Sequence, residues 1–158
     1  MRERRPSEVL RLLNETLRRE DVGDRFVTAA LCALDRVGDG FRATIASAGH
    51  VPAVVRAAGE VRTLDHVGSL LGVFDEIGVD DIELELAPGD ALLLCTDGVT
   101  EARGGSRRQL GLERVAEAAL HGPDGAQALA EAIGTLVIDH AGPVAQDDVA
   151  ILALRVAS

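Results

Sequence analysis

An amphipathic segment comes first in the pattern of apolar and polar positions. Residues 6–19 begin with Pro6 and Ser7, which suit the first turn of a helix, and continue with apolar side chains at helical spacing. This stripe consists of Val9, Leu10, Leu13 and Leu17. The pattern predicts a helix that buries one face against another element.

Short apolar runs separated by turn residues follow. "FVTAALCALD" (26–35) and "FRATIASAG" (41–49) flank the Gly/Asp turn "RVGDG", which predicts an antiparallel hairpin. "AVVRAAGEVRTLD" (53–65) repeats the pattern and predicts a second hairpin, with Gly59 and Glu60 at its turn.

A third hairpin is predicted for "DDIELELAPGDALLLCT", residues 80–96. Its first half alternates aliphatic side chains with acids, which is typical of a strand with one buried face. The chain then turns at Pro88-Gly89-Asp90, a sequence that is favoured in turns for backbone reasons alone. It returns as the continuous apolar run 91–95, which predicts a strand buried on both faces.

The last third of the chain changes character. Residues 110–120 and 124–140 have helical composition and spacing, and "DDVAILALRV" (147–156) predicts a final, well-buried strand. Hairpins followed by helices and one last strand indicate an α+β fold with antiparallel sheets, rather than a doubly wound parallel sheet. The segment 103–108 is expected to be an exposed loop.

Composition narrows the class of protein. A chain of 158 residues with 47% hydrophobic and 27% charged residues fits a single globular domain, 1–158. The net charge of −10 and the poor supply of aromatic side chains argue against a nucleic-acid partner. No apolar stretch is long enough to cross a membrane, so we expect a cytoplasmic protein. Cys32 and Cys95 lie apart within apolar runs, and we interpret both as reduced core residues.

All 16 basic residues are arginine, which excludes mechanisms that need a lysine, such as Schiff-base chemistry. Acids at the ends of two predicted strands remain as candidate chemistry. Asp97-Gly98 follows the run 91–95, and Asp147-Asp148 begins the final strand. If these strands are neighbours, the acids meet in space, and oxygen ligands of this kind suit Mg²⁺ or Mn²⁺. The alternative is that Asp-Gly is an ordinary turn and Asp-Asp an ordinary strand entry.

Six motifs in order resemble the SpoIIE/RsbU-type serine phosphatases, bacterial relatives of the type 2C metal-dependent protein phosphatases. The motifs are "FVTAAL" (26–31), "SAGHVP" (47–52), "GSLLGV" (68–73), "LAPGDALLLCTDGVTEA" (86–102), "LGLERV" (110–115) and "QDDVAILALRV" (146–156). Each motif alone is weak, but together they cover nearly the whole chain. The resemblance implies two antiparallel β-sheets packed as a sandwich and flanked by helices, with a binuclear Mn²⁺/Mg²⁺ site between the sheets.

The same resemblance implies the site residues. Asp97 of the "TDG" motif and Asp147 of "DDV" match metal ligands of the family, Gly98 is included with them in the implied metal site, and Thr96 lies beside it. Asp148 stands where the eukaryotic relatives usually have an asparagine, so either of the adjacent acids could bind the metal. In such sites two cations hold the hydroxide that attacks phosphorus, and a protein nucleophile is dispensable.

Other polar residues are weighed against simpler roles. His50 of "AGH" could act as an acid or base, but we interpret it as a structural hydrogen-bonding residue. His66, His121 and His140 are interpreted as isolated residues of the surface or of loops. A haloacid-dehalogenase-like phosphotransferase would need its nucleophilic Asp at position 95, where this chain has Cys95.

One part of the family pattern is not found in this sequence. Members begin with strands that carry an Asp-Gly pair, whose carboxylate bridges both metals, followed by a helix; here Met1 falls just before the helix that carries "LLNETL". The expectation is therefore an N-terminally truncated domain that lacks its first strands and first helix. Such a domain would bind its cations weakly and would expose sheet edges that favour association with another copy.

The resemblance implies a function in signal transduction. It is the metal-dependent hydrolysis of phosphoserine or phosphothreonine on a regulatory protein, such as the anti-anti-sigma factors of stress-response sigma-factor regulation. The alternative is a module that keeps the fold without the chemistry and regulates by binding a protein partner.

Overall fold

The chain forms two compact units. The structure is a computed structural model that describes residues 5–20, 25–65, 67–104, 108–142 and 147–157. Unit 1 comprises Met1–Pro52 and Asp65–Leu86, and unit 2 comprises Ala53–Leu64 and Ala87–Ser158. Each unit contains one antiparallel sheet, as the sequence predicted. That the whole chain acts as one domain stays a prediction.

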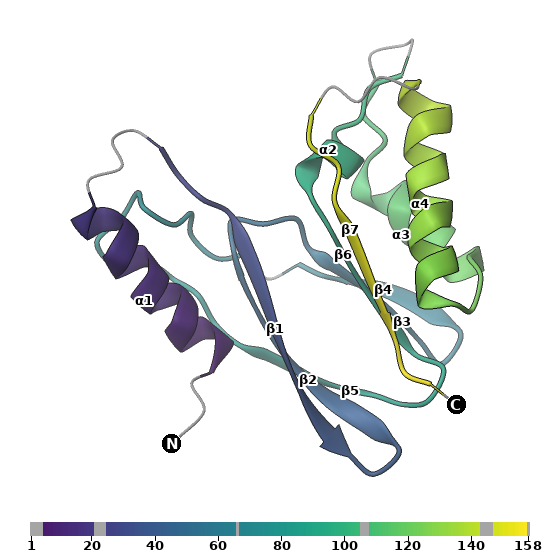
Figure 1. Ribbon diagram of the computed structural model, residues 1–158, viewed down its shortest axis with the longest axis horizontal. Helices are drawn as coiled ribbons and strands as arrows, with labels where there is room; N and C mark the ends of the chain where they lie inside the picture. The colour runs from purple at the N-terminus through teal and green to yellow at the C-terminus, as the bar shows by residue number, and fades with distance from the viewer. Residues whose placement is uncertain (1–4, 21–24, 66, 105–107, 143–146, 158) are drawn as a thin grey trace. The chain divides into compact units, whose positions relative to one another are not determined.

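Unit 1 is a three-stranded sheet with a helix packed on it (Figure 1). The helix is α1 (Pro6–Arg19), and the strands, in the order β1-β2-β5, are β1 (Ala29–Val37), β2 (Gly40–Ala48) and β5 (Ile82–Leu86). The apolar stripe of α1 meets the sheet and the loop before β5, because Leu10 packs with Ala46, Ala48, Leu71 and Val79 in one buried cluster. The predicted helix and first hairpin are confirmed.

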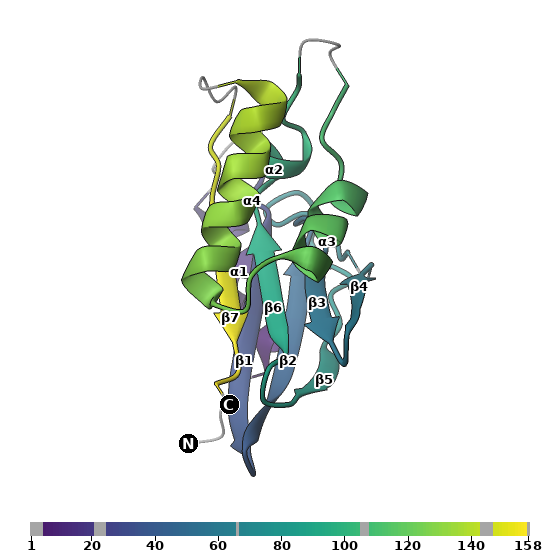
Figure 2. The same ribbon diagram turned by 90° about the vertical axis from the view of Figure 1, so that its right-hand side faces the viewer.

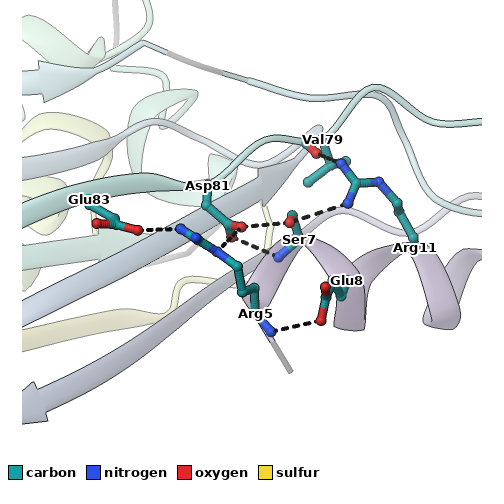
Figure 3. A network of polar contacts seen from close by, with 7 residues as sticks. All are labelled: Arg5, Ser7, Glu8, Arg11, Val79, Asp81 and Glu83. Carbon is teal, nitrogen blue, oxygen red and sulfur yellow. Dashed lines mark hydrogen bonds and ion pairs between the residues drawn. The ribbon is translucent and has the colours of Figure 1, made fainter. Parts of the chain in front are cut away.

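A polar network fixes the start of α1 to the beginning of β5 (Figure 3). The carboxylate of Asp81 accepts hydrogen bonds from the backbone N–H of Ser7 at 2.9 Å, from its hydroxyl at 2.7 Å and from Nε of Arg5 at 2.9 Å. Burial alone would raise the pKa of Asp81, but these bonds from Ser7 and Arg5, with the charge of Arg5, lower it. Arg5 also pairs with Glu83. The carboxylate therefore has a structural role here.

Unit 2 is a four-stranded sheet whose one face is covered by helices α3 and α4 (Figure 2). The strand order is β4-β3-β6-β7, and all pairs are antiparallel. The strands are β3 (Ala53–Ala57), β4 (Glu60–Leu64), β6 (Ala91–Cys95) and β7 (Ile151–Arg155). The helices are α2 (Asp97–Thr100), α3 (Leu112–His121) and α4 (Ala126–Ala141). The central strand β6 is the continuous apolar run, as expected for a strand with neighbours on both sides.

The third predicted hairpin is wrong, although both of its strands exist. β5 pairs with β2 in unit 1, whereas β6 pairs with β3 and β7 in unit 2. The turn between them therefore carries the chain from one sheet to the other. Asp90 stabilises this crossing, because its carboxylate accepts the N–H groups of Ala87 at 2.8 Å and Ala58 at 3.3 Å.

Two smaller predictions also need correction. The hairpin turn between β3 and β4 lies at Ala58 and Gly59, which both have positive φ, and Glu60 already belongs to β4. β7 is not well buried: it begins only at Ile151, and Leu152 is 64% exposed. Successive side chains of a strand point to opposite faces; Ile151 lies toward Gly134 of α4, so Leu152 points to the face away from that helix.

The two cysteines are free thiols, but only one of them lies in the core. Cys32 and Cys95 are both free, and burial raises the pKa of Cys32 and raises that of Cys95 to about 11. Cys95 is buried in unit 2, whereas Cys32 in unit 1 is half-buried. Among the helices that the structure describes, none is both long and apolar enough to span a bilayer.

Candidate metal centre

The first candidate acid lies where the central strand of unit 2 ends. Cys95 is the last residue of β6, Thr96 continues the extended backbone, and Asp97 begins the single turn of α2. The carboxylate of Asp97 is exposed, and its Oδ1 accepts the N–H of Gly98 at 3.0 Å. The buried strand thus presents this acid where β6 runs into α2 (Figure 1 shows these two elements).

The second pair of acids lies just before β7. Asp147 and Asp148 are both exposed, and Oδ1 of Asp147 accepts the N–H of Asp148 at 2.8 Å. Because β7 pairs with β6, with Cys95 opposite Ile151, the two acidic turns lie at the same end of neighbouring strands. The sequence predicted that these acids lie close together if their strands are neighbours, and the pairing of β6 with β7 confirms that condition.

Thr96 joins the two turns through its hydroxyl. Its Oγ1 donates a hydrogen bond to the carbonyl oxygen of Asp148 at 2.8 Å and accepts the N–H of Ala150 at 2.9 Å. Its own backbone N–H donates to the carbonyl of Ala150 at 3.0 Å. The ladder between β6 and β7 is thereby extended as far as the acids.

Gly98 lets the two turns approach closely. A Cβ at this position would lie 2.5 Å from the carbonyl oxygen of Asp148 and 3.4 Å from the carbonyl carbon of Asp147. The first distance is too short for any side chain, so a larger residue would push the turns apart. The Asp-Gly pair is therefore more than an ordinary turn, because the glycine is required by the neighbouring backbone.

The donor chemistry of these turns fits a hard divalent cation. The candidate side-chain ligands are all carboxylates, and Mg²⁺ commonly binds through one or two carboxylates while it keeps several waters. Neither turn forms an ion pair within the described parts of the chain. However, no three His, Cys, Asp or Glu side chains among the described residues are grouped so that they could hold an ion. The residues fit part of a ligand set.

The histidines lie in varied surroundings. His50 belongs to unit 1, where Nδ1 is 3.3 Å from Oγ1 of Thr28 and its carbonyl oxygen accepts the hydroxyl of Ser47 at 3.4 Å. His121 is exposed at the end of α3, and His66 lies outside the described residues.

His140 is not isolated, contrary to the sequence interpretation. Its Nε2 is 2.8 Å from the carbonyl oxygen of Arg108, and its Nδ1 is 3.1 Å from a guanidinium nitrogen of Arg114. It therefore ties α4 to the loop before α3.

An apolar pocket beside the acids was missed by sequence reasoning. It has a volume of about 280 Å³ and is lined by α2, α4 and the residues before β7, including Gly98 and Asp147. The only signal in the sequence was Gly134, a glycine within a helical pattern. A glycine inside a helical pattern costs stability relative to alanine, so its position marks a place where a side chain is missing.

Comparisons with known proteins show the family and the fold of this chain. The family model described as Stage II sporulation protein E (SpoIIE) matches residues 1–157. No curated protein matches the chain.

Solved structures give the same fold. The phosphatase domain of the cell fate determinant SpoIIE from Bacillus subtilis is 16% identical, with a TM-score of 0.68, over 99% of this chain and 77% of that chain. The SiaA-PP2C domain of Pseudomonas aeruginosa is 25% identical, with a TM-score of 0.79, over 96% of this chain and 60% of that chain. The catalytic domain of the serine/threonine protein phosphatase PstP, in complex with two manganese ions, is 18% identical, with a TM-score of 0.63, over 96% of this chain and 70% of that chain.

This chain is shorter than each of these three proteins. The match to the family model extends over nearly all of its residues, and its two antiparallel sheets with helices agree with the solved phosphatase domains. The chain belongs to the SpoIIE family of PP2C-like serine/threonine phosphatases.

Proposed function

We propose that this chain takes part in the metal-dependent hydrolysis of phosphoserine or phosphothreonine on a regulatory protein, with a substrate similar to an anti-anti-sigma factor. The observation that carries the proposal is the pairing of β6 with β7, because it brings the Asp97 turn beside Asp147 and Asp148. Membership of a phosphatase family supplies the reaction class.

The metal ligands in this proposal are Asp97, Asp147 and Asp148, with Thr96 and Gly98 positioning their turns. The related structures support manganese or magnesium, since the SpoIIE domain was soaked with Mn and PstP holds two manganese ions. A bound cation of this kind would neutralise phosphoryl oxygens and make a water acidic enough to attack phosphorus. His50 retains a structural role and is outside the catalytic set.

The residues of the chain contribute position and charge. The exposed carboxylates give the site a negative field that attracts cations, and the β6–β7 ladder holds them on a rigid support. Oδ1 of Asp97 and Oδ1 of Asp147 each accept a backbone N–H from the following residue, which orients both carboxylates.

A second function is favoured by one observation. Within the described residues no group of three ligands is found, so the chain could regulate by binding a protein partner without hydrolysis. The edge strand β1 leaves Leu31 and Leu34 more than one third exposed, and another copy could cover such an edge. We further propose that both units act as one domain and that the protein works in the cytoplasm.

Phosphate release from phosphoserine peptides tests the two functions. With Mn²⁺ we expect turnover in the chain, loss of turnover in Asp97→Asn, and no change in the control Glu117→Gln, an exposed acid on α3. A chain that stays inert at all Mn²⁺ concentrations but forms a stable complex with a phosphoprotein in EDTA would support the binding function instead.

Calorimetric titration with Mn²⁺ tests the completeness of the site. The small ligand set predicts weak binding, so tight binding of two ions per chain would refute it. Light scattering over a range of concentrations tests self-association through the sheet edge. If copies associate there, the average molar mass should rise from that of a monomer toward that of a dimer as the concentration increases.

A further inference from the structure

The apolar pocket of unit 2 has no role in the proposed chemistry, although it adjoins the candidate acids. Its volume is about 280 Å³. The walls include Ala102 after α2, Val137 and Ile138 on α4, and Val149 before β7. The engineered apolar cavity of roughly 150 Å³ that binds benzene sets the scale, so this pocket has room for one large side chain.

Gly134 leaves this pocket open without a structural need for glycine. It lies within α4, where glycine costs roughly 0.5–1 kcal/mol relative to alanine. Its φ is not positive, and a Cβ there would meet only Cδ1 of Ile151, at an ordinary contact distance of 3.9 Å. Neither backbone conformation nor packing therefore requires glycine at this position. The absence of a side chain at Gly134 instead leaves the pocket open.

Two exposed apolar side chains belong to the lining of this pocket. Among the described residues of unit 2, the large hydrophobic side chains that are exposed are Ile138, Val149 and Leu152, with exposures of 55%, 39% and 64%. Ile138 and Val149 line the pocket. An apolar ligand would cover both and remove their surface from water.

The pocket is continuous with the acidic turns. Gly98 and Asp147 belong both to its lining and to the candidate metal centre. Glu101, which is exposed after α2, adds a second carboxylate to the lining. A group bound in the pocket therefore lies next to anything held at Asp147, and a positive charge beside that group would be attracted to Glu101.

We propose that this pocket is a specificity site that receives one aliphatic side chain of the phosphorylated protein segment, with Glu101 facing a basic residue of the same segment. The inference rests on the proposed phosphatase function. The aliphatic residue lies within a few positions of the phosphorylated one, because Asp147 lines both sites.

Two matched phosphoserine peptides test the pocket. One carries leucine and arginine near the phosphoserine, and the other carries serine in place of the leucine. Burial of a leucine side chain predicts about 10- to 100-fold higher kcat/KM for the first peptide. Gly134→Leu should abolish this preference by filling the pocket, and Gly134→Ala should reduce it while α4 keeps its stability. If Gly134→Leu does not fold, Ile138→Ser provides a second test of the same loss.

Binding in EDTA separates the pocket from the chemistry. Fluorescence anisotropy of the labelled peptides should show the same preference for leucine without metal. Because both peptides carry the arginine, Glu101→Gln should weaken the binding of both, whereas Glu117→Gln should not. A persistent preference with no phosphate release would support the pocket and reject the phosphatase function. Equal affinity for both peptides would refute the specificity site. An unchanged ratio of kcat/KM for the two peptides in Gly134→Leu would also refute it.

Discussion

Acidic residues in the two units have opposite surroundings. In unit 1, the side chain of Asp81 is 8% exposed and accepts three hydrogen bonds from Ser7 and Arg5. In unit 2, Asp97 and Asp147 are exposed, and the side chain of each accepts a hydrogen bond from the backbone N–H of the next residue. A carboxylate whose lone pairs are filled by the protein stabilises the fold, whereas one that keeps lone pairs open can bind a ligand.

The supports of these acids differ as well. Asp81 is held through its own side chain, so its loss should affect the folding of unit 1. The acids of unit 2 are held through their backbone, by Thr96 and by the close approach at Gly98. Substitution of their side chains should therefore affect binding and leave folding nearly unchanged.

The largest effect is expected for Asp97→Asn. The amide keeps the size of the side chain but removes the charge, so Mn²⁺-dependent phosphate release should fall by about 100-fold or more. The melting temperature should stay within the error of the Glu117→Gln control. A large fall in melting temperature with unchanged phosphate release would reverse the roles assigned to the two units.

Asp81→Asn should produce the converse result. The amide nitrogen cannot accept the bonds from Ser7 and Arg5, and the loss should destabilise the protein by about 2 kcal/mol in urea unfolding. This value is modest because Arg5 is half exposed and its ion pairs are screened by water. The Mn²⁺ affinity of Asp81→Asn, measured by calorimetry, should equal that of the wild type. A changed affinity would show that Asp81 influences the metal site at Asp97.

Many elements of both units could be predicted from the sequence, but the strand pairing could not. Helical spacing predicted α1, and the continuous apolar run predicted β6 as a strand buried on both faces. The Pro-Gly-Asp turn gave a local hairpin signal, yet β5 and β6 pair with strands far away in the sequence. Such long-range pairing depends on which faces are buried, and a short turn does not determine it.

Only part of the candidate site could be predicted, because the site also depends on long-range strand pairing. Asp97 and Asp147 were identified by motif, and their proximity followed once β7 paired with β6. The role of Thr96 as a bridge needs the carbonyl of Asp148, which only the folded backbone places within reach. The apolar pocket joins α2, α4 and the residues before β7, and no local pattern brings those segments together.

Thr96→Val should give a smaller effect that separates positioning from ligation. Valine keeps the shape of threonine but loses both hydroxyl bonds, and because water can reach these groups the cost in stability should be about 1 kcal/mol. Mn²⁺ affinity should fall by about tenfold, as for other partners that orient a ligand. Thr96→Ser keeps the hydroxyl, so its Mn²⁺ affinity in calorimetry should be close to that of the wild type. If Thr96→Ser binds Mn²⁺ as weakly as Thr96→Val, the hydroxyl does not position the ligands.

The smallest effect is a pH dependence that belongs to unit 1. The pKa of Asp81 is lowered in the folded protein, so its contribution to stability is complete above the unfolded pKa of about 3.9 and disappears as the pH falls through the folded value. The difference in unfolding free energy between the wild type and Asp81→Asn should therefore be constant from pH 7 to about pH 5 and should narrow below about pH 4. Urea unfolding at several pH values measures this difference. A gap that stays constant down to pH 3 would mean that the carboxylate is held by shape alone, and its ionised form would then give no advantage over the amide.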